Sequence, residues 1–350
     1  HADLKTSNCV SCHMPRRRTE DAVHVVLTDH KIQRRPPPGN LLSPLQEVQR
    51  SGRPALYYPQ TLPPNEADLY TGIALISAAS DRKHGIHLIE RQSAHDLPAR
   101  AIAVLAEGYF AEKKYNEAII AFERALSKDP GLSKARYNLA EALAAASRID
   151  QARATFEQTG DIPEAKYALG NLLRRSGDLA GAVQQYRRAL ALRQTFVEAH
   201  TNLGSLYADQ GKLEEARASL EKALRIDPAA DEAHNNLGRV YGAQGAIPNA
   251  LNHLRRALSI NVANVTARYN LARVYQATDA MPAAISEYRR VIALQPAFAE
   301  AHVGLGQALG DMNQLDGAIA EFREALRLQS GNAEAQRSLD LALSMKRGAH

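Results

Sequence analysis

Apolar and polar residues follow one another with the spacing of α-helices along most of this 350-residue chain. From about Asn65 onward, apolar residues recur three and four positions apart in segments rich in Ala, Leu, Glu and Arg, which places them on one face of a helix. Residues 36–64 interrupt the pattern with eight of the chain's sixteen prolines, and proline resists helix and favours extended backbone. The sequence therefore predicts a head at residues 1–36, a semi-rigid linker at 37–64 and a long helical part.

The helical part repeats itself every 34 residues. The pair Leu203-Gly204 returns as Leu237-Gly238, and the small and apolar residues that follow each pair keep the same spacing. One repeat, at residues 133–162, is four residues shorter than the others. Because a fixed period of this length indicates stacked supersecondary units, we expect seven repeats over residues 99–332 and an end helix over 333–350.

A more divergent helical pair is expected at residues 65–98. Gly72 and Leu88 fall in the register of the repeats, but His84 occupies a position where the pattern requires a small residue. We expect this pair to be an eighth, less regular member of the array.

The period and the order of small, large and aromatic residues together resemble the tetratricopeptide repeat over residues 99–332. The resemblance implies an all-α solenoid of helix-turn-helix units, in which small residues at fixed positions let two helices approach closely. It also implies a long concave surface, lined by the first helix of each pair, that binds peptides or partner proteins.

Asparagines recur on the first helices of the repeats. Asn202, Asn236 and Asn270 are 34 residues apart, and Asn138 has the equivalent place in the short repeat. Side-chain amides both donate and accept hydrogen bonds, so a ladder of them suits an extended backbone bound without regard to its sequence. The alternative is that each asparagine bonds to the adjacent helix of the array.

Aromatic and basic residues are expected beside the asparagines on the same surface. They are Tyr137, Tyr167, Tyr269, Arg174, Arg175, Arg239 and Arg273. A mildly basic, partly aromatic surface suits an acidic segment of a partner. Arginines scattered on a solvated helix face are the alternative explanation.

Three histidines also recur in register, at positions His200, His234 and His302. Neighbouring helices pack roughly 8–10 Å apart, whereas imidazoles that share one metal ion must each approach it to about 2 Å. We therefore predict that these histidines are packing residues.

The head contains the chain's two cysteines, in the sequence Cys9-Val-Ser-Cys12-His13. CxxCH is the spacing at which two thiols attach a haem while the adjacent histidine ligates its iron. A disulfide would close a very short loop, and a thioredoxin-like pair needs a strand-helix context that the sequence does not show. Zinc is the more serious alternative, because His24 and His30 complete a spacing one residue short of a two-cysteine, two-histidine finger. The segment after His24 is β-branched where such a finger needs a helix.

Residues 8–15, followed by residues 28–32, resemble the last haem segment of multihaem cytochromes c of the nitrite reductase and hydroxylamine oxidoreductase kind. The resemblance implies haem c, attached through Cys9 and Cys12, with His13 as the proximal iron ligand. It also implies a protein that works outside the cytoplasm, in the periplasm, where haem is attached to this motif.

The second axial ligand of the iron stays open. His24 and His30 are the local candidates, both within reach of an extended segment; His1 and a ligand from a missing part of the protein are the alternatives. Bis-imidazole iron has no vacant site and suits electron transfer. Multihaem cytochromes carry several CxxCH motifs, whereas this sequence has one, and it opens on His1 rather than Met. We therefore expect a processed or truncated piece of a longer protein, with any reductase activity in the missing part.

Positive charge is concentrated near the head. Residues 1–60 carry nine Lys or Arg against five Asp or Glu, which gives +4 of the chain's net charge of +5. A basic head suits an acidic redox partner, while nucleic acid is disfavoured because the run Arg16–Arg18 has no interleaved aromatics. The sequence shows no apolar run near the roughly 20 residues of a membrane span, and no phosphate loop or nucleophile elbow that would indicate an enzyme.

Taken together, the patterns predict an electron-transfer cytochrome segment joined to a repeat array that docks a protein partner. The alternative is a pure interaction scaffold whose Cys/His head is vestigial or binds zinc.

Overall fold

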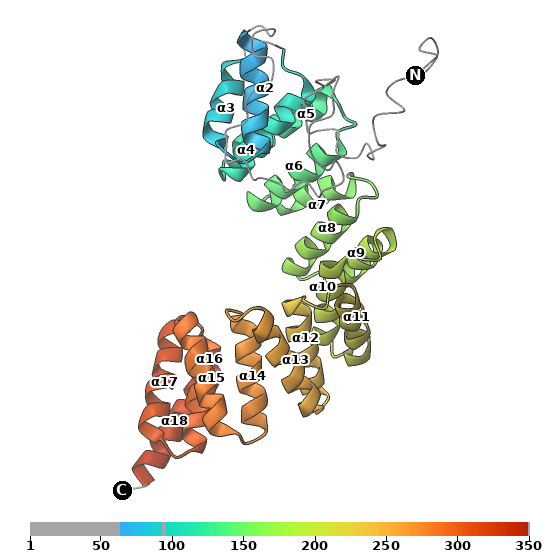
Figure 1. Ribbon diagram of the computed structural model, residues 1–350. Coiled ribbons are helices and arrows are strands. Elements are labelled where there is room, and N and C mark those ends of the chain that lie inside the picture. Colours follow the sequence, from blue (N-terminus) through green and yellow to red (C-terminus); the bar gives the residue numbers. More distant parts are fainter. Residues whose placement is uncertain (1–63, 93–95, 349–350) are drawn as a thin grey trace, which may run out of the picture. The chain divides into compact units, whose positions relative to one another are not determined.

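The computed structural model describes residues 64–92 and 96–348. Within these two ranges there are seventeen α-helices and no strand (Figure 1), so the prediction of an all-α repeat array is confirmed. None of these helices is both long and apolar enough to cross a membrane. The head, with Cys9, Cys12, His13, His24 and His30, lies outside the described residues, as does the linker before Pro64.

The chain divides into two compact units after Leu97. The described part of the first unit is one helical hairpin, formed by α2 (Pro64–Ser77) and α3 (Arg82–Arg91). A side chain at Gly72 would lie 2.8 Å from the carbonyl oxygen of Gly85, so the two helices cross at a pair of glycines. The expectation of a small residue at position 84 was therefore off by one, since His84 is exposed and its neighbour Gly85 is buried at the crossing.

The second unit consists of seven antiparallel helix pairs followed by an end helix. In chain order they are α4 (Ala99–Ala111), α5 (Tyr115–Lys128), α6 (Ser133–Ala145), α7 (Ile149–Glu157), α8 (Pro163–Arg175), α9 (Leu179–Leu192), α10 (Val197–Asp209), α11 (Leu213–Ile226), α12 (Asp231–Ala243), α13 (Ile247–Ile260), α14 (Val265–Ala277), α15 (Met281–Leu294), α16 (Ala299–Asp311), α17 (Leu315–Leu328) and α18 (Ala333–Gly348). Each second helix also packs against the first helix of the next pair.

Small residues set the distance between the two helices of a pair. A Cβ atom at Gly204 of α10 would lie 2.6 Å from Cγ of Leu220 on α11, and one at Gly170 of α8 would lie 2.7 Å from the ring of Tyr186 on α9. Real Cβ atoms do not approach other heavy atoms so closely. The glycines are thus where the first helix makes room for a large, fully buried side chain of the second.

The turn within each pair has a left-handed residue at the end of the first helix. Gly177, Gly211 and Gly245 have φ values of +86°, +73° and +74°, and the series continues at 34-residue intervals with Asp279 and Asn313. A residue in this conformation ends a helix and satisfies its last carbonyls, and glycine adopts it without steric strain. The repeated turn explains why every pair begins its second helix in the same direction.

The short repeat differs from the others mainly in its second helix. Helix α7 has nine residues, whereas α9 and α11 have fourteen. Ala152 and Phe156 of α7 are nevertheless fully buried, at 0% and 1% exposure. The missing residues therefore come from the far end of the helix and leave its contact with α6 in place.

Candidate functional site

The first helices of the pairs carry two separate hollows. The α6–α12 hollow has a volume of about 700 Å³, and its polar and aromatic lining is Tyr137, Glu141, Tyr167, Asn171, Arg174, Arg175, Asn202 and Glu232, with Phe156 beneath them. The α14–α18 hollow has a volume of about 410 Å³ and is lined by Tyr269, Arg273, Gln276, Tyr288, Glu300, Gln307, Asn332 and Glu334. We call the surface formed by the first helices, with both hollows, the first-helix face.

An amide network forms the floor of the α6–α12 hollow. Asn202 Nδ2 donates to Tyr167 Oη (3.0 Å) and to Asn171 Oδ1 (2.9 Å), and Asn171 Oδ1 also accepts a bond from Tyr186 Oη (2.7 Å). Both N–H groups of the Asn202 amide are thus used inside the protein. Asn202 Oδ1 and Asn171 Nδ2 have no protein partner among the described residues. One free acceptor and one free donor match the two hydrogen-bonding groups of a peptide unit.

Burial changes the ionisation of the groups around this floor. Burial, followed by the nearby carboxylate of Glu141, raises the pKa of Tyr137 to about 12, so its hydroxyl keeps its proton at neutral pH. Burial also raises the pKa of Glu141, against the opposing effect of Arg175. The hollow therefore combines hydroxyl donors, two guanidinium groups at Arg174 and Arg175, and two carboxyl groups.

The α14–α18 hollow is built from a stacked aromatic wall. The Tyr269 ring lies 5.9 Å from the ring of Tyr288 and 5.0 Å from that of Phe298, and the guanidinium of Arg273 lies 5.9 Å above the Tyr269 ring centre. Tyr288 Oη donates to Gln276 Oε1 at 2.8 Å. Burial raises the pKa of both tyrosine hydroxyls, so they too stay protonated at neutral pH.

The structure brings together seven of the eleven residues predicted on the binding surface. Tyr137, Tyr167, Arg174, Arg175 and Asn202 line the α6–α12 hollow, and Tyr269 and Arg273 line the α14–α18 hollow. Their predicted role in binding a partner stays a prediction.

The other four predicted residues lie outside both hollows. Asn138 Nδ2 donates to Glu107 Oε1 (3.0 Å), Asn270 Nδ2 donates to Asn235 Oδ1 (2.9 Å), and Asn236 Oδ1 accepts from Asn235 at 3.3 Å. These bonds mostly join first helices of neighbouring repeats, which is the alternative interpretation of the asparagines. Arg239 is likewise held by a carboxylate of the preceding repeat, Asp209, at 2.7 Å.

Acidic residues of the hollows were missed in the sequence. Glu232, Glu300 and Glu334 recur in a 34-residue register that also contains Glu164 and Glu198, and the period alone was enough to find them. Because these carboxylates line the same hollows as the arginines, the surface is mixed in charge. It is not the mildly basic surface that its arginines alone predict.

Asn171 was also missed, although it shares the register of Arg239, Arg273 and Gln307. The two arginines of this register were recognised in the sequence by their charge. An uncharged amide at the same position gave no comparable signal, yet it supplies the free donor of the α6–α12 hollow.

The three registered histidines contact other partners and not one another. His234 Nδ1 lies 2.9 Å from His253 Nδ1, His302 Nδ1 lies 2.7 Å from Glu321 Oε2, and His200 Nε2 donates to the Gln194 carbonyl oxygen at 3.1 Å. In the described part of the chain, no three or more His, Cys, Asp or Glu side chains are grouped as a metal site would require.

Comparison with known proteins identifies the repeats. Family models described as tetratricopeptide repeat match residues 109–172, 235–297 and 281–333, and a model described as TPR repeat matches residues 170–211 and 204–245. Together they cover residues 109–333, more than half of the chain. No curated protein matches the sequence.

Solved structures of other repeat proteins share the fold. The Cut9–Hcn1 hetero-tetramer of the APC/C is similar over 82% of this chain, with 16% identity and a TM-score of 0.60, and this chain covers 58% of that one. A tetratricopeptide repeat protein from Parabacteroides merdae has 14% identity and a TM-score of 0.57, with 70% and 98% of the two chains covered. MamA has 30% identity and a TM-score of 0.41 over 47% of this chain and 97% of its own.

The chain thus spans less than two thirds of the first of these structures, and identities of 14% and 16% show the fold alone. The family models, the 34-residue period and the paired helices agree with one another. This chain belongs to the tetratricopeptide repeat family.

Proposed function

We propose that the chain is an interaction scaffold that holds an extended segment of a partner protein on its first-helix face. Tetratricopeptide repeats suit protein or peptide partners, and the observation that carries the proposal is the floor of the α6–α12 hollow. There, Asn202 Oδ1 and Asn171 Nδ2 offer one acceptor and one donor, beside aromatic rings that can cover apolar side chains.

The charges of the two hollows indicate the kind of segment that fits. Arg174 and Arg175 lie in the α6–α12 hollow with Glu232, and Arg273 lies in the α14–α18 hollow with Glu300. A segment that carries both acidic and basic side chains is matched by this mixture. A purely acidic segment would meet carboxylates in each hollow, and like charges brought together weaken binding.

The test is selection of binding peptides from a random-sequence library on the full chain, followed by affinity measurements with two variants. The variant Asn202→Ala with Arg175→Ala should weaken the selected peptides about tenfold or more, because one amide bond and one charge-assisted bond together contribute at least about 1.4 kcal/mol. The control Asn138→Ala removes an amide outside both hollows and should leave the affinity within twofold. Equal affinity of the selected peptides for all three proteins would contradict the proposal.

We also propose, from the sequence motif at Cys9, Cys12 and His13, that the head carries haem c, that it passes electrons to a redox partner, and that the protein works outside the cytoplasm. The test is a visible spectrum of the chain produced in a host that attaches haem c. A Soret band and a sharp α-band after reduction are expected, and both should be absent from the Cys9→Ala, Cys12→Ala variant. A spectrum without these bands, with one zinc per chain, would favour the zinc alternative.

A further inference from the structure

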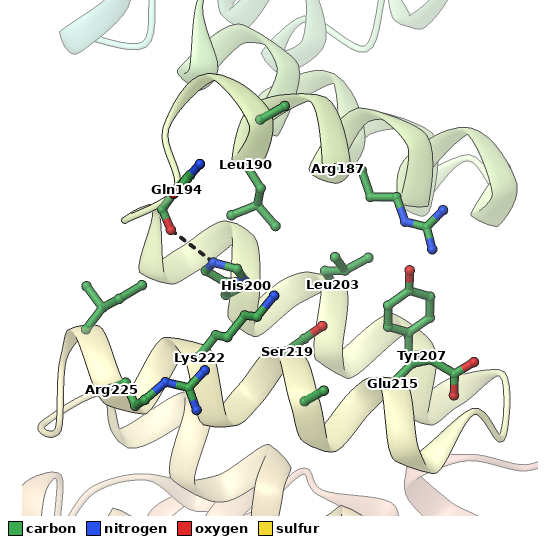
Figure 2. A pocket seen from close by; sticks show the side chains of 13 residues that line it. Arg187, Leu190, Gln194, His200, Leu203, Tyr207, Glu215, Ser219, Lys222 and Arg225 are labelled. Carbon is green, nitrogen blue, oxygen red and sulfur yellow. Dashed lines mark hydrogen bonds between the residues drawn. The ribbon is translucent and has the colours of Figure 1, made fainter.

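A third pocket lies between the second helices α9 and α11, away from the two hollows. It has a volume of about 720 Å³, and none of its lining residues belongs to the first-helix hollows. Figure 2 shows His200 and Gln194 at one end of this pocket, with Lys222 and Arg225 of α11 beside them, and Arg187, Tyr207 and Glu215 at the other end. We call it the His200 pocket.

The residue at the register position of His200 has two polar partners in each of the next three repeats. The first is the backbone carbonyl six residues earlier, and the second is the side chain nineteen residues later, on the second helix of the same pair. His234 contacts Pro228 O (3.2 Å) and His253 (2.9 Å), Arg268 contacts Val262 O (2.8 Å) and Glu287 (2.8 Å), and His302 contacts Pro296 O (3.0 Å) and Glu321 (2.7 Å).

His200 has the first of these partners and lacks the second. Its Nε2 donates to the carbonyl oxygen of Gln194 at 3.1 Å, but the residue nineteen positions later is Ser219, whose side chain is too short to take the place of Glu287 or Glu321. His200 is 7% exposed, and its Nδ1 is buried without a hydrogen-bond partner. A buried polar atom left unpaired costs about 1–3 kcal/mol, so the site favours a partner from outside.

The charged residues around His200 Nδ1 attract an anion. Arg187, Lys222 and Arg225 are exposed cations of the pocket lining, and Glu215 is its one acidic residue. No carboxylate of the described residues forms an ion pair with these three cations; Arg187 instead lies 5.8 Å above the ring of Tyr207. With His200 neutral, the lining carries three positive charges and one negative charge.

We propose that the His200 pocket binds an Asp or Glu side chain of a partner protein, whose carboxylate takes the place that Glu287 and Glu321 fill in later repeats. Protonated His200 donates a hydrogen bond from Nδ1 to that carboxylate, and Lys222 and Arg225 balance its charge. The site is independent of the first-helix face, because it opens between second helices and uses none of the residues of either hollow. The chain would then hold a partner at two surfaces.

Binding of a carboxylate at this place is coupled to uptake of one proton. Neutral His200 keeps its N–H on Nε2, where it faces the Gln194 carbonyl, so Nδ1 must gain a proton from solvent before it can donate. Burial lowers the pKa of His200 in the free protein, and the charges of Lys222 and Arg225 lower it further. A carboxylate reverses the effect of those cations and favours the imidazolium, so affinity should rise as pH falls from about 8 to about 6. The other charged groups that line the pocket with His200 are Arg187, Lys222, Arg225 and Glu215.

The experiment uses a fluorescent hexaglutamate peptide, capped at both ends, and the full chain at about 0.15 M salt, where charge attraction beyond about 8 Å is screened. The variant Ser219→Glu places a carboxylate where Glu287 and Glu321 stand in their repeats, so it should weaken the peptide at least tenfold and abolish the pH dependence. The control Asn252→Glu adds the same charge to an exposed position of α13 and should stay within twofold of the wild type. The double variant Lys222→Ala, Arg225→Ala changes exposed side chains only and should also weaken the peptide at least tenfold.

Amide hydrogen exchange with bound peptide should show protection over residues 187–226, which separates this site from the basic head. Equal peptide affinity in Ser219→Glu and Asn252→Glu would overturn the proposal, as would protection confined to other regions or affinity that does not rise toward pH 6. A pocket that binds inorganic phosphate, but from which hexaglutamate cannot displace it, would also overturn the assignment to a partner's carboxylate.

Discussion

Two glycines of helix α12 should respond in opposite directions to the same substitution. A Cβ atom at Gly238 would lie 2.6 Å from Cγ of Leu254 and 3.2 Å from the carbonyl oxygen of Ala250, whereas one at Gly242 would have Cγ2 of Val274 as its nearest neighbour, at 3.7 Å. The first position has no room for a methyl group. The second has ordinary van der Waals space.

The magnitudes follow from two opposing effects. Alanine in a helix interior is favoured over glycine by about 1 kcal/mol, and overpacking a tight contact costs about 1–3 kcal/mol. Because Leu254 Cγ is close to its backbone and cannot swing away, we take the upper end of this range at Gly238 and expect Gly238→Ala to destabilise by about 2 kcal/mol. Gly242 lies in the last turn of α12, so Gly242→Ala should stabilise by about 0.5 kcal/mol.

Amide hydrogen exchange measures the effect where it arises. Repeat arrays are stabilised repeat by repeat and by contacts between neighbours, so protection should fall in α12 and α13 for Gly238→Ala and rise slightly there for Gly242→Ala. Protection in α4 and α5 serves as the internal reference and should not change. If both variants moved the protection of α12 in the same direction, the close crossing at Gly238 would not be what fixes glycine there.

Two further predictions concern charged and titrating groups. Replacing Glu287 by Gln leaves the guanidinium of Arg268, whose side chain is 9% exposed, without its carboxylate. The change should lower the free energy of unfolding, measured by urea denaturation, by about 2–3 kcal/mol, which is less than the 3–5 kcal/mol of a wholly buried pair because Gln still accepts a hydrogen bond. The control Glu157→Gln, in a pair exposed on both sides, should change stability by less than about 0.5 kcal/mol. Burial lowers the pKa of His234 and of His253, and the neighbouring His234 lowers the pKa of His253 further. Below about pH 6.5 the unfolded chain therefore binds more protons than the folded one, so stability should be constant above that pH and fall as pH drops toward the lowered pKa values. A urea midpoint that does not change between about pH 7.5 and 5 would contradict this.

The repeat pattern was enough to predict the helices because each position has the same packing in every repeat. Leu203-Gly204 and its equivalents face the second helix of their own pair, and this contact tolerates few residue types. The hairpin at residues 64–91 departs from the repeat pattern by one residue, because Gly85 and not His84 lies at the crossing of its helices. A single divergent pair has no neighbouring repeats to fix its register.

The roles of polar residues were harder to predict, since they depend on what faces them from another helix. Asn202 and Asn270 share a register, yet Asn202 lies in the floor of the α6–α12 hollow and Asn270 is buried against Asn235. The nineteen-residue pairing of His302 with Glu321 is visible in the sequence only once the two helices are known to face each other at those positions. Once the nineteen-residue spacing is known, Ser219 alone indicates that His200 has no side-chain partner on the second helix.

The shortened helix α7 has a consequence for how such an array can vary in length. Helix α7 ends at Glu157, one residue after Phe156, and the four residues missing from this repeat correspond to about one helical turn. Because that turn lies beyond Phe156, Ala152 and Phe156 stay buried against α6. The far end of a second helix can therefore shorten without loss of the contact within its pair, while Tyr137 and its neighbours on the first helices keep their places. The length of the array and the chemistry of its binding face can thus diverge independently.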